Sequence, residues 1–185
     1  MKVGEIDAIN YKNNEAVEAK EKVVLDETIT LTINNDISRS LSAIEDSLEE
    51  FAVGYLFNEN MVNTMDAIKK IEVDGVNIHA EIDDTLLKTN ETVLCSDSAG
   101  GWRSKIKHVN PVESTFQVHV SELIDRIEEL KNNAEIWQAT GGTHVAGIVH
   151  EDQFIVKEDV SRHVAVDKEI GYGLLHDFDL SQSYV

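Results

Sequence analysis

The sequence predicts a mixed α/β fold in which strands and helices pack as layers of a sandwich. Segments in which apolar and polar residues alternate occur early and again near the end of the chain. Segments with apolar residues at helical spacing lie between them. This order is typical of α/β folds rather than of all-β folds or helical bundles. Hydrophobic residues make up 42% of the 185 residues, enough for a packed core.

The first predicted elements are a strand and a helix. Residues 23–34 alternate between apolar and polar side chains, which predicts a half-buried strand, and the turn signal Asn34-Asn35-Asp36 follows. Apolar residues at helical spacing over 48–56 predict an amphipathic helix. Ser47 and Glu50 have the spacing of a capping box at its start.

The remaining elements alternate between strands and helices. Residues 69–83 predict a hairpin with an Asp-Gly turn. A second amphipathic helix is predicted over 120–130, followed by short strands at 145–149 and 153–157. The last predicted helix covers 162–175.

The charge and composition exclude several function classes. The chain has 16 basic and 35 acidic residues, a net charge of −19, which repels nucleic acid and anionic membranes. Its single cysteine, Cys95, can form neither an internal disulfide nor a multi-cysteine zinc site, so no structural metal is expected. The first residues lack the apolar core of a secretory signal, and no apolar run has the length of a membrane span. We therefore expect a cytoplasmic protein.

Two glycine pairs are candidate site features. Gly100-Gly101 follows Cys95, and the second pair lies in Thr140-Gly141-Gly142-Thr143-His144. Neither matches a phosphate-binding loop, and the pattern alone favours an ordinary turn over a site for each pair. The small polar residues after Cys95 predict an exposed loop, whereas a lone cysteine that packs as a small apolar residue is the alternative.

The segment Glu158–Lys168 carries six charged or titratable side chains in eleven residues. His163 and Asp167 are four residues apart and would share a helix face, where a carboxylate can fix the tautomer of an imidazole. Arg162 is expected to pair with a nearby carboxylate. An exposed helix start with ordinary ion pairs explains the same spacing, so the pattern alone leaves both interpretations open.

These segments resemble the formate dehydrogenase accessory (FdhD-like) family. Residues 140–146 and 158–168 resemble its T-G-G-x-H-x-A and E-D-V-G-R-H-N-A-x-D-K motifs. Residues 49–62 resemble its E-L-A-x-G-F-L-x-x-E-G segment, and Cys95 stands where the family has a C-G-x-C-G loop. The resemblance runs from about Val24 to the end of the chain.

The resemblance implies a cytidine-deaminase-like three-layer sandwich with a small added subdomain, and a homodimer. Residues 1–110 would form the N-terminal subdomain with the Cys95 loop, and residues 111–185 part of the deaminase-like core. Cys95 would accept sulfur as a persulfide from a cysteine desulfurase and pass it to the molybdopterin guanine dinucleotide of formate dehydrogenase, acting as a sulfurtransferase. The residues implied to contact that cofactor are Gly100, Gly101, Thr140, Gly141, Gly142, His144, Arg162 and His163.

Several positions depart from the family pattern. Ser98 replaces the second cysteine of the loop, and Ser161 and Val164 replace a glycine and an asparagine. The chain ends at Val185 where family members continue, so we expect a truncated member with an apolar sheet edge at 180–185 that favours association. These departures favour an alternative: a degenerate member that binds cofactor or partner without transferring sulfur. A zinc deaminase is rejected, because the P-C-x-x-C motif that must accompany H-x-E in such enzymes cannot be formed with a single cysteine.

Overall fold

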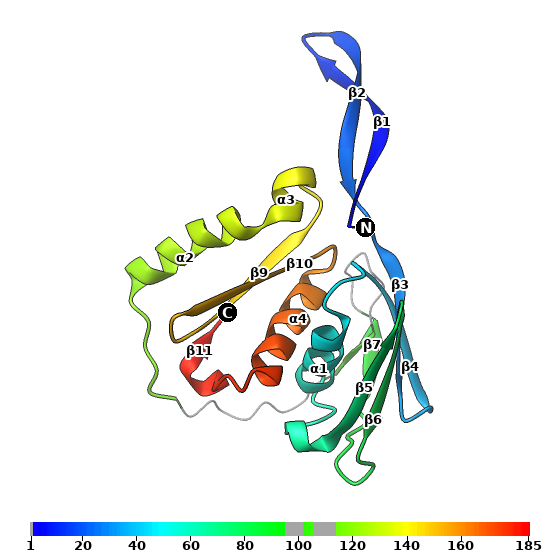
Figure 1. Ribbon diagram of the computed structural model, residues 1–185, viewed down its shortest axis with the longest axis vertical. Coiled ribbons are helices and arrows are strands. Elements are labelled where there is room, and N and C mark those ends of the chain that lie inside the picture. The colour runs from blue at the N-terminus through cyan, green and yellow to red at the C-terminus, as the bar shows by residue number, and fades with distance from the viewer. Residues whose placement is uncertain (1, 95–101, 106–113) are drawn as a thin grey trace.

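The computed structural model describes residues 2–94, 102–105 and 114–185, and it confirms the predicted mixture of strands and helices (Figure 1). Two sheets flank a central pair of helices. The predictions made for Cys95, Ser98, Gly100 and Gly101 fall outside the described residues.

The larger sheet has four strands and holds most of the apolar core. In spatial order its strands are β4 (Ile37–Ala43), β3 (Glu27–Ile33), β6 (Asn77–Ile82) and β5 (Ile68–Asp74). The predicted strand and the predicted hairpin are both confirmed within it. Asn34 and Asn35, with φ of 49° and 57°, make the β3–β4 turn, and Gly75, with φ of 55°, makes the β5–β6 turn. Asparagine and glycine tolerate this left-handed conformation, which explains why the turn signals in the sequence were reliable.

Helix α1 (Leu48–Asn58) packs on this sheet through side chains such as Phe51 and Leu56, which are completely buried. The helix is confirmed, but the predicted capping box at Ser47 and Glu50 is wrong. Ser47 has a left-handed backbone, with φ of 51°, and its side chain makes no cap hydrogen bond. Instead Lys157 Nζ donates to Ser47 Oγ at 2.8 Å and lies 3.2 Å from Glu50 Oε1.

The smaller sheet is antiparallel and has the order β10 (Gln153–Asp159), β9 (His144–His150), β11 (Ser183–Tyr184). Helix α4 (Arg162–Leu175) packs against β9 and β10, with its predicted bounds confirmed. The short β11 is an edge strand of this sheet, as expected for residues 180–185, and Val185 beside it is exposed.

Helices α1 and α4 lie side by side between the two sheets (Figure 1) and touch backbone to backbone. A Cβ atom on Gly54 would lie 1.8 Å from the carbonyl oxygen of Asp167, and one on Gly171 would lie 1.7 Å from that of Glu50. Only glycine fits at these two positions. Because α1 and α4 come from opposite sides of the predicted boundary at residue 110, the two proposed domains share this contact, and the division itself stays a prediction.

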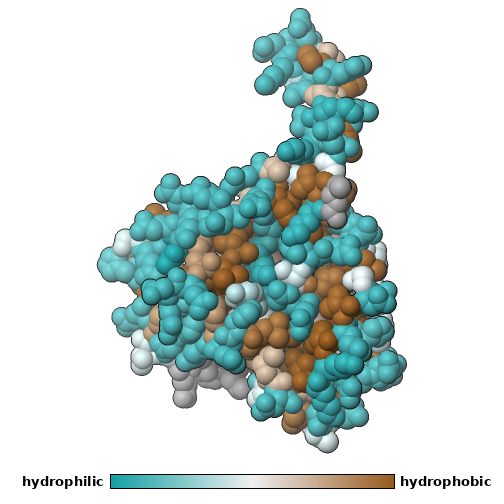
Figure 2. All heavy atoms as spheres, viewed as in Figure 1, coloured by the Kyte–Doolittle hydropathy of each residue, from teal (hydrophilic) through white to brown (hydrophobic). Residues whose placement is uncertain are grey.

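The remaining elements lie at the periphery, and none but α2 is predicted by a sequence pattern. They are β1 (Val3–Lys12), β2 (Glu15–Val24), η1 (Met65–Ala67), β7 (Thr92–Leu94), β8 (Trp102–Ser104), α2 (Val120–Asn133), α3 (Glu135–Thr140) and η2 (Leu180–Gln182). Strands β1 and β2 form a hairpin that projects from the body, and Figure 2 shows it as a mostly hydrophilic arm. Within the described residues, no helix combines the length and apolarity needed to cross a membrane.

Candidate functional site

The two motif segments at residues 140–144 and 158–168 meet along the β9–β10 pair. His144 is the strand partner of Asp159, and Thr143 Oγ1 donates to Glu158 Oε2 at 2.8 Å. The carboxylate of Glu158 also accepts the backbone N–H groups of Ile136 and Trp137 at the start of α3, at 2.8 and 2.6 Å. The prediction that the two segments lie within side-chain contact is confirmed, and Glu158 is one of the groups that joins them.

Asp159 and Lys168 form a buried ion pair that fixes the start of α4. Their atoms Oδ2 and Nζ are 2.7 Å apart, and both side chains are 0% exposed. The same carboxylate accepts the N–H groups of Ile44 and Ser161, each at 3.0 Å, and Lys168 donates to the carbonyl of Ile44 at 3.2 Å. Most of the hydrogen-bonding capacity of the pair is thus satisfied, as burial of charge requires, and the pair serves as scaffold.

A second buried charge cluster joins α1, α4 and β8. Arg103 Nη1 donates to Glu59 Oε1 at 3.0 Å and lies 2.8 Å from Asp167 Oδ2. The second of these contacts is ionic, because the N–H geometry of Arg103 does not give Asp167 Oδ2 a hydrogen bond. Asn58 Nδ2 donates to Asp167 Oδ1 at 2.8 Å, and the backbone N–H of Ser104 donates to Glu59 Oε2.

The cluster has two carboxylates for one guanidinium, and burial together with these charges shifts the pKa values of Asp167, Arg103 and the neighbouring Tyr55. Burial raises the pKa of Asp167, and neighbouring Arg103 opposes the shift. Burial also acts to lower the pKa of Arg103, but Asp167 and Glu59 outweigh it, so the net shift is upward and the guanidinium stays charged. Burial, assisted by Glu59, raises the pKa of Tyr55 to about 12, and Arg103 lies 5.1 Å from its ring centroid.

The turn at Thr140–His144 is largely explained as the end of helix α3. Gly141, with φ of 64°, is its C-cap residue. Thr140 Oγ1 donates to the carbonyl of Ile136 at 2.7 Å and accepts the N–H of Gly142 at 3.1 Å. A Cβ atom on Gly142 would lie 2.8 Å from Val24 Cγ1, so this glycine permits a close approach of β2. The end of helix α3 and the approach of β2 therefore explain both glycines without a bound ligand.

Three predicted site residues lie near one another by their places in the fold. His144 begins β9 and is exposed, Arg162 begins α4 and is exposed, and His163 is half-buried. The expectation that Arg162 pairs with a carboxylate is not met among the residues that the structure describes. Arg162 is exposed at the first residue of α4, and the nearby carboxylates of Glu158 and Asp159 accept from other donors.

The functional candidates that no motif predicted are Arg103 and Glu169. Arg103 lacks a local signal because its partners are 44 and 64 residues away. Glu59 and Asp167, in contrast, lie inside the segments that resemble the family motifs. Glu169 is completely buried on α4, and both its carboxylate oxygens are without a hydrogen-bond partner in the described part of the chain. Burial raises the pKa of Glu169 to about 9, although Lys157 acts in the opposite direction.

The ends of the Cys95 loop are held by the β7–β8 pair. Leu94 is the strand partner of Trp102, so residues 95–101 span between two paired strands. Cys95 follows Leu94 directly in the sequence, and Arg103 follows Trp102. The roles predicted for Cys95 and the first glycine pair stay predictions, because these residues lie outside the described ranges.

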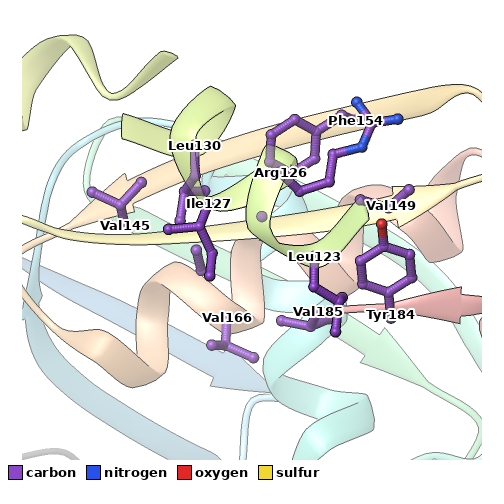
Figure 3. Close-up of a pocket in the computed structure, with 12 residues that line it drawn as sticks. Leu123, Arg126, Ile127, Leu130, Val145, Val149, Phe154, Val166, Tyr184 and Val185 are labelled. Atoms are coloured by element: carbon purple, nitrogen blue, oxygen red, sulfur yellow. The ribbon is translucent and has the colours of Figure 1, made fainter. Parts of the chain in front are cut away.

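An apolar cavity of about 430 Å³ lies between α2 and strands β9 and β10 (Figure 3). Leu123, Ile127 and Leu130 of α2 contribute to its wall. Its polar side chains already have partners, since Arg126 pairs with Glu129 at 2.5 Å and Tyr184 donates to Glu122 at 2.8 Å. The cavity offers packing volume rather than directed polar contacts. Across the described ranges, no group of three or more His, Cys, Asp or Glu side chains is arranged to hold a metal ion.

Comparisons with known proteins identify relatives over most of the chain. The sequence pattern of the FdhD/NarQ family matches residues 24–185. The sulfur carrier protein FdhD of Methanothermobacter thermautotrophicus is 40% identical over 182 residues, which cover 98% of this chain and 73% of that protein. Protein FdhD of Methanocaldococcus jannaschii is 29% identical, with 93% of this chain and 67% of that protein covered. The crystal structure of a proposed formate dehydrogenase accessory protein from Desulfotalea psychrophila superposes with a TM-score of 0.74 at 18% identity, covering 98% of this chain and 71% of that one.

Proposed function

Because the chain belongs to the FdhD/NarQ family, we propose that it is a sulfur carrier in the maturation of formate dehydrogenase and that Cys95 carries the sulfur. The observation that carries the proposal is the match over residues 24–185 to a family whose relatives are named sulfur carrier proteins. Persulfide chemistry requires a thiol, and Cys95 is the only thiol of the chain.

The proposed reaction is a thiol exchange in which Cys95 gains one sulfur atom. The Cys95 thiolate attacks the outer sulfur of a persulfide on a cysteine desulfurase, a new S–S bond forms, and the donor cysteine leaves as a thiolate. An acceptor atom with a free electron pair then attacks the outer sulfur, the S–S bond on Cys95 breaks, and Cys95 leaves as a thiolate that can be loaded again. One thiol is sufficient for this relay, so Ser98 in place of a second cysteine does not prevent it.

The proposed acceptor is molybdopterin guanine dinucleotide, bound transiently as a substrate. Arg162 and His144 are exposed at the start of α4 and of β9, where a cation and an imidazole can contact phosphate groups. We propose that the same cofactor is also contacted by Gly100, Gly101, Thr140, Gly141, Gly142 and His163. With a net charge of −19, the chain depends on such local contacts to hold an anion.

We place the protein in the cytoplasm as a homodimer, with formate dehydrogenase as its client. We also propose that residues 111–185 belong to a cytidine-deaminase-like core. The exposed edge at β11 is compatible with pairing to a second chain.

Sulfur loading tests the proposal directly. The chain is incubated with a cysteine desulfurase and cysteine, and intact-mass spectrometry then measures the sulfur gained by wild type and by Cys95→Ala. A gain of one sulfur atom on wild type, absent from the variant, supports the carrier role. No gain on wild type overturns it. Binding of the cofactor without any gain would favour the alternative, a degenerate member without transfer activity, which the serine at position 98 suggests.

A further inference from the structure

Hairpin β7–β8 depends on the rest of the protein for its position. Each strand has only three residues, and an isolated two-stranded ribbon is marginally stable even when it is longer. No other strand pairs with it among the described residues. What places this hairpin must therefore be its contacts with other elements.

Those contacts converge on Glu59, at the end of α1. Its carboxylate accepts from Arg103 Nη1 and from the N–H of Ser104, both on β8. Its backbone carbonyl accepts from Asn90 Nδ2 at 2.9 Å, two residues before β7. A single residue thus holds the chain on both sides of the hairpin.

Arg103 extends this attachment from α1 to α4. Its second carboxylate, Asp167, lies in the charged motif segment and is oriented by Asn58. The side chains of Arg103, Glu59 and Asp167 are 11%, 6% and 2% exposed. Water and salt screen such a buried cluster far less than a surface ion pair, so its charges attract one another more strongly.

We propose that Arg103, Glu59 and Asp167, which we call the Arg103 clasp, are positioning residues that fix hairpin β7–β8 and thereby set where Cys95 is presented to its sulfur donor. Cys95 is one peptide bond beyond Leu94, and Leu94 pairs with the residue that precedes Arg103. The clasp therefore acts on the strands that flank Cys95 in the sequence. The role of the clasp in sulfur transfer rests on the proposed function, whereas its role in holding hairpin β7–β8 does not.

Spin labelling tests the mechanical part alone. Because Cys95 is the only cysteine, a nitroxide reagent labels that position uniquely in the full chain. The line shape of the electron paramagnetic resonance spectrum is compared between wild type, Arg103→Met, Arg103→Lys and Arg126→Met. Circular dichroism checks that each variant is folded. Arg126→Met is the matched control, because it removes an arginine whose ion pair lies within α2. We expect narrower spectral lines for Arg103→Met, because the label moves more freely. Arg103→Lys should restore the wild-type line shape in part, and the control should leave it unchanged.

Sulfur loading tests the functional part. Loading by a desulfurase requires two proteins to align, and we expect Arg103→Met to slow it by about tenfold or more. Alkylation by iodoacetamide requires only an accessible thiolate, and we expect it to change by less than about twofold. A folded Arg103→Met with wild-type line shape and loading rate would overturn the proposal. If Arg103→Met does not fold, Glu59→Gln, which keeps the volume of the side chain, takes its place.

The two failures are distinguishable. If wild type gains no sulfur but the spectrum still narrows in Arg103→Met, the proposed function fails and the positioning role stands. If wild type gains sulfur but the spectrum does not change, the clasp fails and the proposed function stands.

Discussion

Replacing Glu169 with methionine is expected to stabilise the protein by about 3 kcal/mol at pH 7 and to remove part of its pH dependence. Glu169 is 0% exposed and its carboxylate has no hydrogen-bond partner among the described residues. An ionised carboxylate is costly in such surroundings, so the folded chain keeps this side chain protonated. Methionine has a similar length and needs neither a proton nor a partner.

The magnitude follows from the pKa of Glu169, which burial raises from 4.5 to about 9. Between these values the unfolded chain has lost the proton and the folded chain still holds it. The folded chain therefore binds one more proton, and its stability falls as pH rises, by about 1.4 kcal/mol per pH unit. From pH 6 to pH 8 this residue alone lowers the free energy of unfolding by about 3 kcal/mol.

Urea unfolding at pH 6, 7 and 8 measures the effect in wild type, Glu169→Met and Glu128→Met. The last variant is the control, because Glu128 is exposed on α2 and the same exchange there removes a solvated charge. The difference between wild type and Glu169→Met should grow steadily with pH, whereas the control should follow wild type. Parallel pH profiles for wild type and Glu169→Met would refute the reasoning, and so would a variant less stable than wild type at pH 8.

Three further predictions concern the scaffold of the site, and urea unfolding measures each. Gly54→Ala should destabilise by about 3 kcal/mol or prevent folding, because its Cβ has no room against α4; Gly75→Asn, in an open turn with φ of 55°, should remain close to wild type. Lys168→Met should lower the free energy of unfolding by about 3 to 5 kcal/mol, because it leaves the buried carboxylate of Asp159 without its cation. Adding Asp159→Leu should restore part of that stability, and no recovery would mean that the pair contributes through packing. Thr143→Val should cost about 1 kcal/mol through the lost bond to the β10 carboxylate, and an unchanged midpoint would contradict that bond.

Local patterns in the sequence predicted the elements whose residues repeat at a clear period. Strand β3 has three apolar residues on one face, and α4 begins and ends where its pattern does. Strand β4 was missed because Ser38, Ser40 and Ser42 interrupt its apolar pattern, although they alternate with partly or fully buried residues. Hairpin β1–β2 was missed because charged and polar residues interrupt the apolar pattern of both strands, and because no further strand pairs with it among the described residues.

The candidate site was predictable only where its residues are neighbours in the chain. The meeting of residues 140–144 with 158–168 followed from two adjacent strands. The Arg103 clasp was not predictable, because it depends on the approach of α1, β8 and α4, which are far apart in sequence. The capping box at Ser47 failed for a similar reason: a distant lysine, Lys157, holds the hydroxyl that a local motif would have assigned to the helix start.

The close contact at Gly54 of α1 and Gly171 of α4 fixes the position of each helix along the other. Moving either helix by one residue along the other would bring Val53 or Tyr55 to the position of Gly54, and neither has room there. Sliding of the two sheets past each other is thus blocked by the main chain itself, whatever the surrounding side chains do. Rotation about the crossing point is the motion that remains. Such a rotation would change the separation of Glu59 and Asp167, and with it the attachment of hairpin β7–β8.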